Sequence, residues 1–166
     1  RILLSRITLM YNNYKGFLIK FYMLFRKCMA FHGLIGARRV GSVDDLTILK
    51  LNRDASFGEK NVLLYIPYDN VIYKEVAYFG RWSDDNVIFF ENAMKNSKKI
   101  LYLDIGANIG LTVLQVLKVK PKNLELECWA FEPVPNNFEA LKHNTKRFSD
   151  QTKLYNFALG TFDGKT

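Results

Sequence analysis

The sequence predicts an α/β fold with a parallel sheet, and three observations support this. From residue 99 onward, apolar strand-like runs alternate with helical runs. The first of these strands ends in an acid that is followed by a glycine-containing turn, an arrangement typical of ligand loops in such sheets. With 166 residues, 49% of them apolar and 14% aromatic, the chain can also build a buried core.

The main domain is expected over residues 99–166. Its pattern predicts strands at 100–105, 124–131 and 153–158, with helices at 108–118 and 135–148 between them. Strands that alternate with helices form parallel sheets through right-handed crossovers, so we expect a Rossmann-like, doubly wound domain. Because an open sheet of this kind has about six strands, we expect the chain to hold only the first half of the domain.

Residues 42–98 predict a small α+β extension that precedes the main domain. Residues 46–51 and 62–66 have the composition of strands, with a polar connection at 52–61 between them. A turn is expected at 67–70 and a helix at 87–95.

Residues 1–41 predict a basic amphipathic helix and a linker. Apolar residues recur at alternating spacings of four and three, at Leu3, Ile7, Met10, Tyr14, Phe17, Phe21, Leu24 and Cys28. The glycines at 33, 36 and 41 indicate a linker into short strands. This helix either lies on an anionic bilayer through residues 1–30, as a peripheral membrane contact, or packs on its own domain.

The positive charge of the sequence is concentrated at its N-terminus. The chain has 24 Lys and Arg against 16 Asp and Glu, a net charge of +8. Eight of the bases and none of the acids fall in residues 1–41, which leaves a neutral remainder. A neutral remainder argues against a nucleic-acid groove that runs across the fold, so we expect no nucleic-acid partner.

Cysteine usage and hydropathy favour a cytoplasmic protein. Cys28 and Cys128 lie 100 residues apart, with no Cys-x-x-Cys pair and no neighbouring His, so we expect neither a disulfide framework nor a metal site. Lys or Arg interrupts every apolar run well short of a membrane-spanning length. Because the chain begins at Arg1 and not at Met, we expect it to be a fragment.

The strongest functional signal is the segment ILYLDIGANIGLT at residues 100–112. An apolar strand delivers Asp104 to its carboxyl end, and Gly106 lets the backbone turn tightly beside a ligand. Gly110 falls in the first turn of the next helix, where a missing side chain allows close packing or ligand approach. The amides at that helix N-terminus can receive a carboxylate or a phosphate.

The residues of this loop favour S-adenosylmethionine over a nicotinamide dinucleotide. A dinucleotide fingerprint needs Gly-x-Gly-x-x-Gly, and Asn108 stands at the second glycine position. Asp104 would repel a pyrophosphate but suits the cationic amine and sulfonium of S-adenosylmethionine. An NAD-dependent oxidoreductase is therefore the weaker alternative.

Glu132 follows the second predicted strand, 22 residues after Gly110. A carboxylate at that position can accept hydrogen bonds from both hydroxyls of a ribose. Alternatively, Glu132 caps the helix that starts near Pro135. The pairing of Glu132 with the Asp104 loop favours the ribose interpretation.

Together these motifs resemble the FkbM-type methyltransferases, class I enzymes that depend on S-adenosylmethionine. The resemblance rests on DIGANIG at 104–110, FEPVPNNFEALKHN at 131–144 and NFALGTFDG at 156–164. YFGRWSDD at 78–85 also resembles the Gly-x-Trp element that often precedes the first of these motifs in the family. The resemblance covers residues 75–164, roughly half of the chain.

The resemblance implies O-methylation of a hydroxyl on a sugar, a glycolipid or another small acceptor, with S-adenosylmethionine as cofactor. By position, the methionine part would lie against Asp104, Gly106, Asn108 and Gly110, the ribose against Glu132, and the adenine near Asn156 and Ala158. Pro133 and Asn137 would shape the loop after the second strand. The family continues beyond its third strand, where acceptor contacts would lie, so we expect activity to need further residues.

No catalytic base is predicted. His143 has the surroundings of a surface residue, and His32 lies in the basic linker. GTFDGKT at 160–166 lacks the spacing of a P-loop, and KNSKKI at 95–100 is typical of a solvated loop. A further alternative is a non-catalytic membrane-surface or assembly module, in which the N-terminal helix is the working part.

Overall fold

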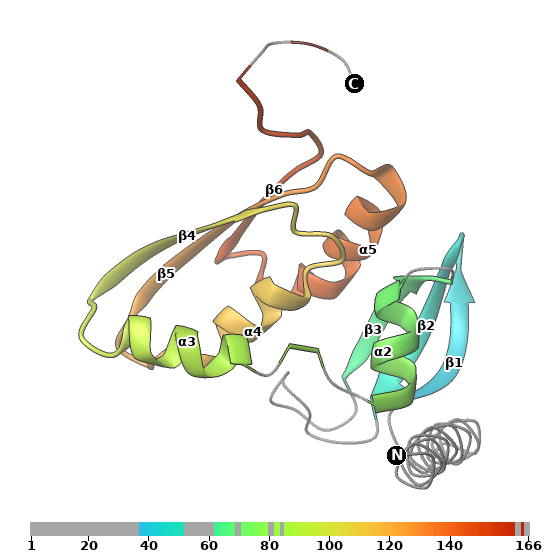
Figure 1. Ribbon diagram of the computed structural model, residues 1–166, viewed down its shortest axis with the longest axis horizontal. Coiled ribbons are helices and arrows are strands. Elements are labelled where there is room, and N and C mark those ends of the chain that lie inside the picture. The colour runs from blue at the N-terminus through green and yellow to red at the C-terminus, as the bar shows by residue number, and fades with distance from the viewer. Residues whose placement is uncertain are drawn as a thin grey trace, which may run out of the picture.

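The computed structural model describes residues 37–51, 62–68, 71–79, 82–83, 85–161 and 164. The expected N-terminal helix, the connection at 52–61 and His32 lie outside the described residues. The described chain contains two three-stranded sheets, one antiparallel in the order β1-β2-β3 and one parallel in the order β4-β5-β6 (Figure 1).

The antiparallel sheet is a meander of β1 (Ala37–Val43), β2 (Leu46–Leu51) and β3 (Leu63–Pro67). The expected linker is corrected here, because residues 37–41 belong to β1. Val43 pairs with Leu46, so the β1–β2 turn has two residues, and Asp44 adopts a left-handed conformation there (φ 48°). Acids with short side chains tolerate this conformation better than most residues.

Helix α2 (Val71–Phe79) packs on this meander, and the sequence analysis did not predict it (Figure 1). Ile72, Val76 and Ala77 are its buried residues, at spacings of four and one. This spacing is the signal of an amphipathic helix. The pattern is short and follows a turn directly, which is why it did not stand out.

The parallel sheet confirms the predicted α/β fold. It contains β4 (Lys99–Ile105), β5 (Glu125–Phe131) and β6 (Thr152–Tyr155). Helix α4 (Leu111–Val119) connects β4 to β5, and α5 (Pro135–Thr145) with a 3₁₀ turn (Lys146–Phe148) connects β5 to β6. Helix α3 (Asp85–Met94) precedes β4 and packs against α4.

Two element boundaries differ from the expected ones for physical reasons. Helix α4 begins at residue 111 and not at 108, because Asn108 (φ 51°) and Gly110 (φ 83°) have left-handed backbones that a right-handed helix excludes. Strand β6 ends at Tyr155 and not at Ala158, because its partner Phe131 is the last residue of β5.

One hydrophobic core lies between the parallel sheet and its helices. Residues 126, 128 and 130 of β5 point into it and are at most 4% exposed. The core also contains Phe90 and Met94 of α3, Val113 and Val116 of α4, and Leu141 of α5. The three helices therefore cover the same face of the sheet.

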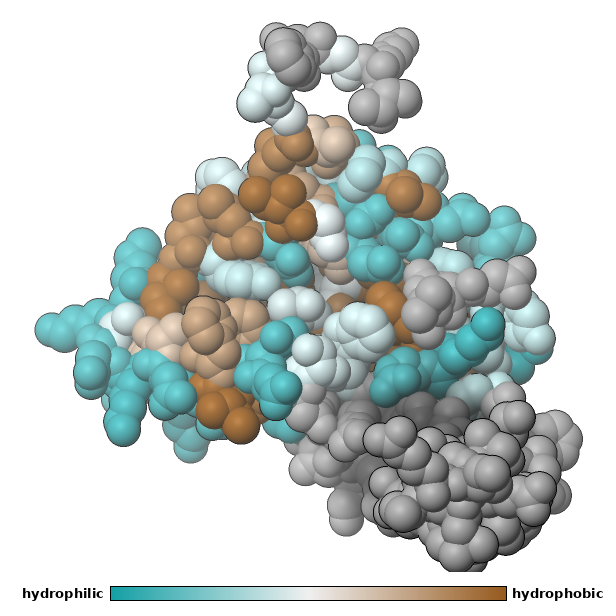
Figure 2. Space-filling view, viewed as in Figure 1, coloured by the Kyte–Doolittle hydropathy of each residue, from teal (hydrophilic) through white to brown (hydrophobic). Residues whose placement is uncertain are grey.

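The opposite face of the parallel sheet has no helix over it among the described residues. Leu101, Leu103 and Ile105 alternate along β4 on this face and are 50%, 48% and 64% exposed. Hydrophobic side chains accordingly reach the surface in Figure 2. Parallel sheets are normally buried on both faces, and the described residues supply one of the two helical layers.

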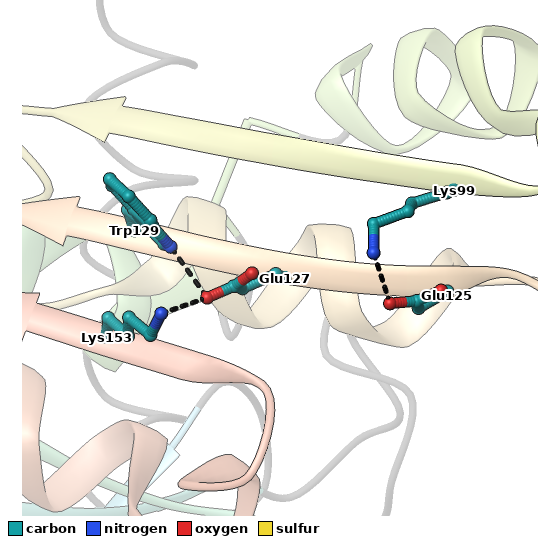
Figure 3. Close-up of polar contacts among 5 residues, drawn as sticks. All are labelled: Lys99, Glu125, Glu127, Trp129 and Lys153. Atoms are coloured by element: carbon teal, nitrogen blue, oxygen red, sulfur yellow. Dashed lines mark hydrogen bonds and ion pairs between the residues drawn. The ribbon is translucent and has the colours of Figure 1, made fainter.

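Cross-strand ion pairs occupy the polar part of this uncovered face (Figure 3). Lys99 of β4 pairs with Glu125 of β5 at 2.6 Å, and Lys153 of β6 pairs with Glu127 at 2.6 Å. Trp129 Nε1 donates to the same Glu127 carboxylate at 2.9 Å. These contacts link all three strands in register, although exposed pairs of this kind stabilise a protein only weakly.

The antiparallel meander shares a second core with the main domain. Buried residues of the meander and α2, such as Leu64 and Val76, belong to one hydrophobic cluster with Ile109 and Leu114 of the main domain. Asn144 of α5, 6% exposed, connects the two parts through hydrogen bonds. It accepts from Tyr65 N (2.7 Å) and donates to Tyr65 O (3.0 Å) and to Ile109 O (2.8 Å). The meander and α2 are thus packed on the main domain.

None of the helices in the described ranges combines the length and the apolar character that crossing a bilayer requires.

We expect Asn144→Ala to lower the free energy of unfolding by about 2–4 kcal/mol, because one buried and two partly buried backbone groups lose their partner. Asn136→Ala, at an exposed position of the same helix, should change it by about 0.5 kcal/mol or less. Urea denaturation followed by circular dichroism measures both values. Equal values for the two variants would contradict the role of Asn144 in joining the sheets.

Candidate functional site

Three polar residues meet at the carboxyl edge of the parallel sheet. Asp104 is the penultimate residue of β4, Glu132 directly follows β5, and Asn156 directly follows β6. Register places them together, because Asp104 pairs with Ala130 and Ala130 pairs with Leu154. Ligands of open parallel sheets bind at this edge. The structure therefore brings together three of the residues that the sequence singled out.

The loop from β4 to α4 reverses direction through three left-handed residues. Gly106, Asn108 and Gly110 have φ angles of 84°, 51° and 83°. Glycine adopts this conformation without strain, and asparagine is among the few other residues that tolerate it. Asn108 can therefore replace a glycine in the turn, and it adds a side chain that a dinucleotide loop lacks.

The two glycines of this loop have different roles. A Cβ atom on Gly110 would lie 2.6 Å from Leu141 Cδ1 and 3.3 Å from Thr145 Cγ2. Gly110 is the N-cap residue of α4 and not part of its first turn, and its missing side chain lets α4 approach α5. A Cβ atom on Gly106 would meet nothing within 4 Å. Gly106 therefore faces open space, where a ligand has room.

The Glu132 carboxylate holds two loops together, and we call this arrangement the Glu132 clasp. Glu132 is 4% exposed. Its Oε2 accepts a hydrogen bond from Asn108 N (2.8 Å), and its Oε1 accepts one from Val134 N (2.9 Å). A buried carboxylate needs such donors, and hydrogen bonds that involve an ionised group are the stronger ones.

The carbonyl group of Phe131, the residue before Glu132, also accepts hydrogen bonds from this loop. Gly106 N and Ala107 N both donate to Phe131 O at 2.9 Å. With Asn108 N on Glu132, three consecutive amides face the end of β5. These amides are therefore committed to the protein, and the loop does not present them to an anion. The amides of the first turn of α4 remain without helical partners by geometry.

The surroundings of Asp104 disfavour its ionised form. Its Oδ2 is buried and has no hydrogen-bond partner among the described residues. Burial, and then the charge of nearby Glu132, raises the pKa of Asp104 to about 6. Both causes disfavour the ionised form. A positive group beside Asp104 would satisfy the free oxygen and reverse the shift.

Asn156 closes the site from the third strand. Its Nδ2 donates to Glu132 O at 2.8 Å and to Pro133 O at 3.3 Å, which fixes the loop after β5 against the end of β6. Ala158 lies three residues beyond β6 and is exposed. Asn137 is half-buried in the first turn of α5.

The described residues contain no good candidate for a base or a metal ligand set. His143 stacks on Tyr65 with ring centroids 4.5 Å apart, near the end of α5. Burial raises the pKa of Cys128 to about 12, with contributions from Asp104 and Glu127. No group of three or more His, Cys, Asp or Glu side chains gathers in the part of the chain that the structure describes.

Gln115 is a positioning residue that the sequence analysis missed. It is fully buried in α4, and its Nε2 donates to Trp82 O and to Ser83 O (3.4 Å). Trp82 and Ser83 are thereby attached to the helix that follows the ligand loop. A polar residue within the apolar run VLQVL was the signal in the sequence.

Alanine should lower the free energy of unfolding more at Gly110 than at Gly106. Gly110→Ala should lower the free energy of unfolding by about 2–4 kcal/mol, through overpacking against Leu141 and an unfavourable φ. Gly106→Ala should cost only about 1–2 kcal/mol, because φ alone is unfavourable there. Thermal and urea unfolding of both variants measures the difference. A larger loss at Gly106 than at Gly110 would overturn these assignments.

Comparisons with known proteins show limited similarity. No family model and no curated protein matches the chain. It is similar to Pyrococcus horikoshii TYW2 in complex with MeSAdo, at 16% identity and a TM-score of 0.45, over 74% of this chain and 39% of TYW2.

It is also similar to the putative transferase PH0793 of Pyrococcus horikoshii, at 16% identity and a TM-score of 0.39, over 70% of this chain and 37% of that chain. The chain thus spans less than half the length of either protein. At these scores neither likeness bears on what this chain binds. The resemblance to FkbM-type enzymes stays a prediction.

Proposed function

We propose that this chain binds S-adenosylmethionine at the carboxyl edge of its parallel sheet and belongs to a methyltransferase. One observation carries the proposal. Asp104, the penultimate residue of β4, has a buried carboxylate oxygen with no partner among the described residues, beside a glycine turn that opens into free space. An unpaired buried charge is costly, so this arrangement favours a ligand that brings a positive group.

The direction of the loop amides favours the same ligand over a dinucleotide. Pyrophosphate binding in parallel sheets relies on loop amides that point at the phosphates. Here the amides of residues 106, 107 and 108 donate to Phe131 and Glu132 instead. A pyrophosphate would also meet two carboxylates, Asp104 and Glu132. S-adenosylmethionine carries a cationic amine and a sulfonium, and it has no phosphate.

Each residue of the site has a role in this proposal. Asp104 binds the α-amino group, and Gly106 leaves room for the methionine part. Glu132 keeps the lone pairs that the clasp does not use, and these accept the ribose hydroxyls. Phe157 is 49% exposed and its ring lies 5.7 Å from that of Phe131, which offers an apolar surface for the adenine beside Asn156.

In this proposal the protein contributes to the reaction by orienting the reacting groups. When bound, the cofactor supplies an electrophilic methyl group. The carboxyl edge of the sheet holds the cofactor in a fixed position. Alignment of the reacting groups supplies much of the acceleration of such a transfer. Burial raises the pKa of Tyr102 and of Cys128, so neither side chain supplies a proton acceptor at neutral pH.

The acceptor we propose is a hydroxyl on a sugar, a glycolipid or another small molecule, in the manner of the FkbM-type enzymes. The proposal rests on the ordered motifs at 104–110, 131–144 and 156–164. We also propose that the protein acts in the cytoplasm, since its thiols form neither a paired framework nor a metal motif in the sequence.

Isothermal titration with S-adenosylmethionine, S-adenosylhomocysteine and NAD tests the ligand. We expect the two adenosyl ligands to bind and NAD not to bind. Asp104→Asn should weaken binding of S-adenosylhomocysteine by about tenfold to a hundredfold, the value of a charge-assisted hydrogen bond. Asp150→Asn, at an exposed acid in the turn before β6, should leave binding unchanged. Binding of NAD alone would refute the proposal.

The raised pKa of Asp104 also predicts a pH-dependent stability without ligand. Between about pH 4 and 6 the folded state binds this proton more tightly than the unfolded state, so the stability that Asp104 contributes rises as the pH falls through that window. Asp104→Asn should remove this dependence and raise the free energy of unfolding at pH 7 by on the order of 2 kcal/mol. Denaturant titrations at several pH values measure it. A variant less stable than the unsubstituted chain at pH 7 would show that Asp104 is not strained by burial.

A further inference from the structure

Two lysine-rich loops lie side by side at the amino edge of the parallel sheet. Residues 95–98 lead into β4, and residues 120–124 lead into β5. The loops touch, because Glu125 N donates to Lys98 O at 2.9 Å. They carry four lysines, at positions 95, 98, 120 and 122, and no acid occurs among residues 92–99 or 111–124.

The positive charge of these loops faces solvent. Lys95, Lys98 and Lys122 are exposed, and Lys120 is half-buried. Glu125, the acid nearest in sequence to the second loop, already pairs with Lys99 at 2.6 Å. The ion pairs Lys142–Glu139 and Lys153–Glu127 involve other lysines. The amino edge is therefore a positive surface, whereas the carboxyl edge holds the buried acids of the candidate site.

Helix α3 adds exposed apolar side chains next to this positive surface. Ile88 is 61% exposed and Phe89 is 66% exposed. Lys95 directly follows the last residue of α3, so α3 leads into the first lysine loop. The exposed acid Glu91 lies between Ile88 and Lys95 on this helix. Figure 2 shows hydrophilic side chains gathered at the end where β4 and β5 begin, with hydrophobic ones next to them over α3. We call Ile88, Phe89, Lys95, Lys98 and Lys122 the basic–apolar face.

We propose that the basic–apolar face docks the protein on an anionic lipid surface. Lysines near such a surface contribute about 1 kcal/mol each. Exposed aliphatic and aromatic side chains enter the boundary between headgroups and acyl chains. A nucleic acid would use the lysines but gain nothing from Ile88, so the mixed chemistry favours a bilayer. This surface is separate from residues 1–30 and independent of the proposed methyl transfer.

Flotation of the full 166-residue chain with vesicles tests the charged part of the face. The vesicles contain phosphatidylcholine with or without about 30% phosphatidylserine. The patch variant carries Lys95→Gln, Lys98→Gln and Lys122→Gln, and the control variant carries Lys74→Gln, Lys142→Gln and Lys146→Gln. Each removes three positive charges from the net +8 at exposed sites, so both keep the basic residues 1–41. We expect about a hundredfold weaker binding for the patch variant and little change for the control.

A second variant, Ile88→Ser with Phe89→Ser, tests the apolar part. It should weaken binding to phosphatidylserine vesicles and leave binding to poly(U) RNA unchanged. Circular dichroism and thermal unfolding show whether each variant is folded. Equal binding by the patch and control variants would overturn the proposal. A second outcome would also overturn it: the Ile88→Ser, Phe89→Ser variant still binds the vesicles, and the patch variant loses binding to poly(U). The face would then be a general polyanion surface.

Discussion

The Glu132 clasp is the interaction on which the candidate site depends. A carboxylate that is 4% exposed needs hydrogen-bond donors, and here the donors are backbone amides of the two loops that surround it. Because Asn108 N turns toward Glu132, the whole loop after β4 presents its amides to β5. Beside this loop lie a buried oxygen of Asp104 that has no hydrogen-bond partner among the described residues, and Gly106, on which a Cβ atom would meet nothing within 4 Å. The ligand that suits the site therefore depends on the direction of these loop amides.

The direction of the parallel strands gives the domain two unlike edges. All carboxyl ends share one edge, where the acids Asp104 and Glu132 lie, and the amino ends of β4 and β5 share another, where the lysine loops gather. The core and the helices lie between these edges on one face of the sheet. The acids and the lysine loops therefore lie at different edges of the same sheet.

Periodicity predicted the α/β class and the three parallel strands, and motif spacing placed Asp104 and Glu132 at the ends of neighbouring strands. Asn156 was named only through the family resemblance, in a strand expected to continue to residue 158. These features depend on local patterns and on the rule that parallel strands end at one edge. The direction of the amides could not be predicted, because it depends on a contact between residues 108 and 132. Asn144 was missed for the same reason, since its partner Tyr65 is 79 residues away. The charge count beyond residue 41 was neutral, and only the fold showed that its lysines cluster.

The pKa of Asp104 is the most direct test of the proposal that this carboxylate binds the amine of the ligand. A ¹³C NMR titration of its carboxyl group, with and without saturating S-adenosylhomocysteine, gives the pKa in both states. We expect a pKa of about 6 in the free protein, because burial and Glu132 disfavour the charge, and a clear fall when the amine binds. An ordinary pKa in the free protein, or one that the ligand leaves unchanged, would contradict it.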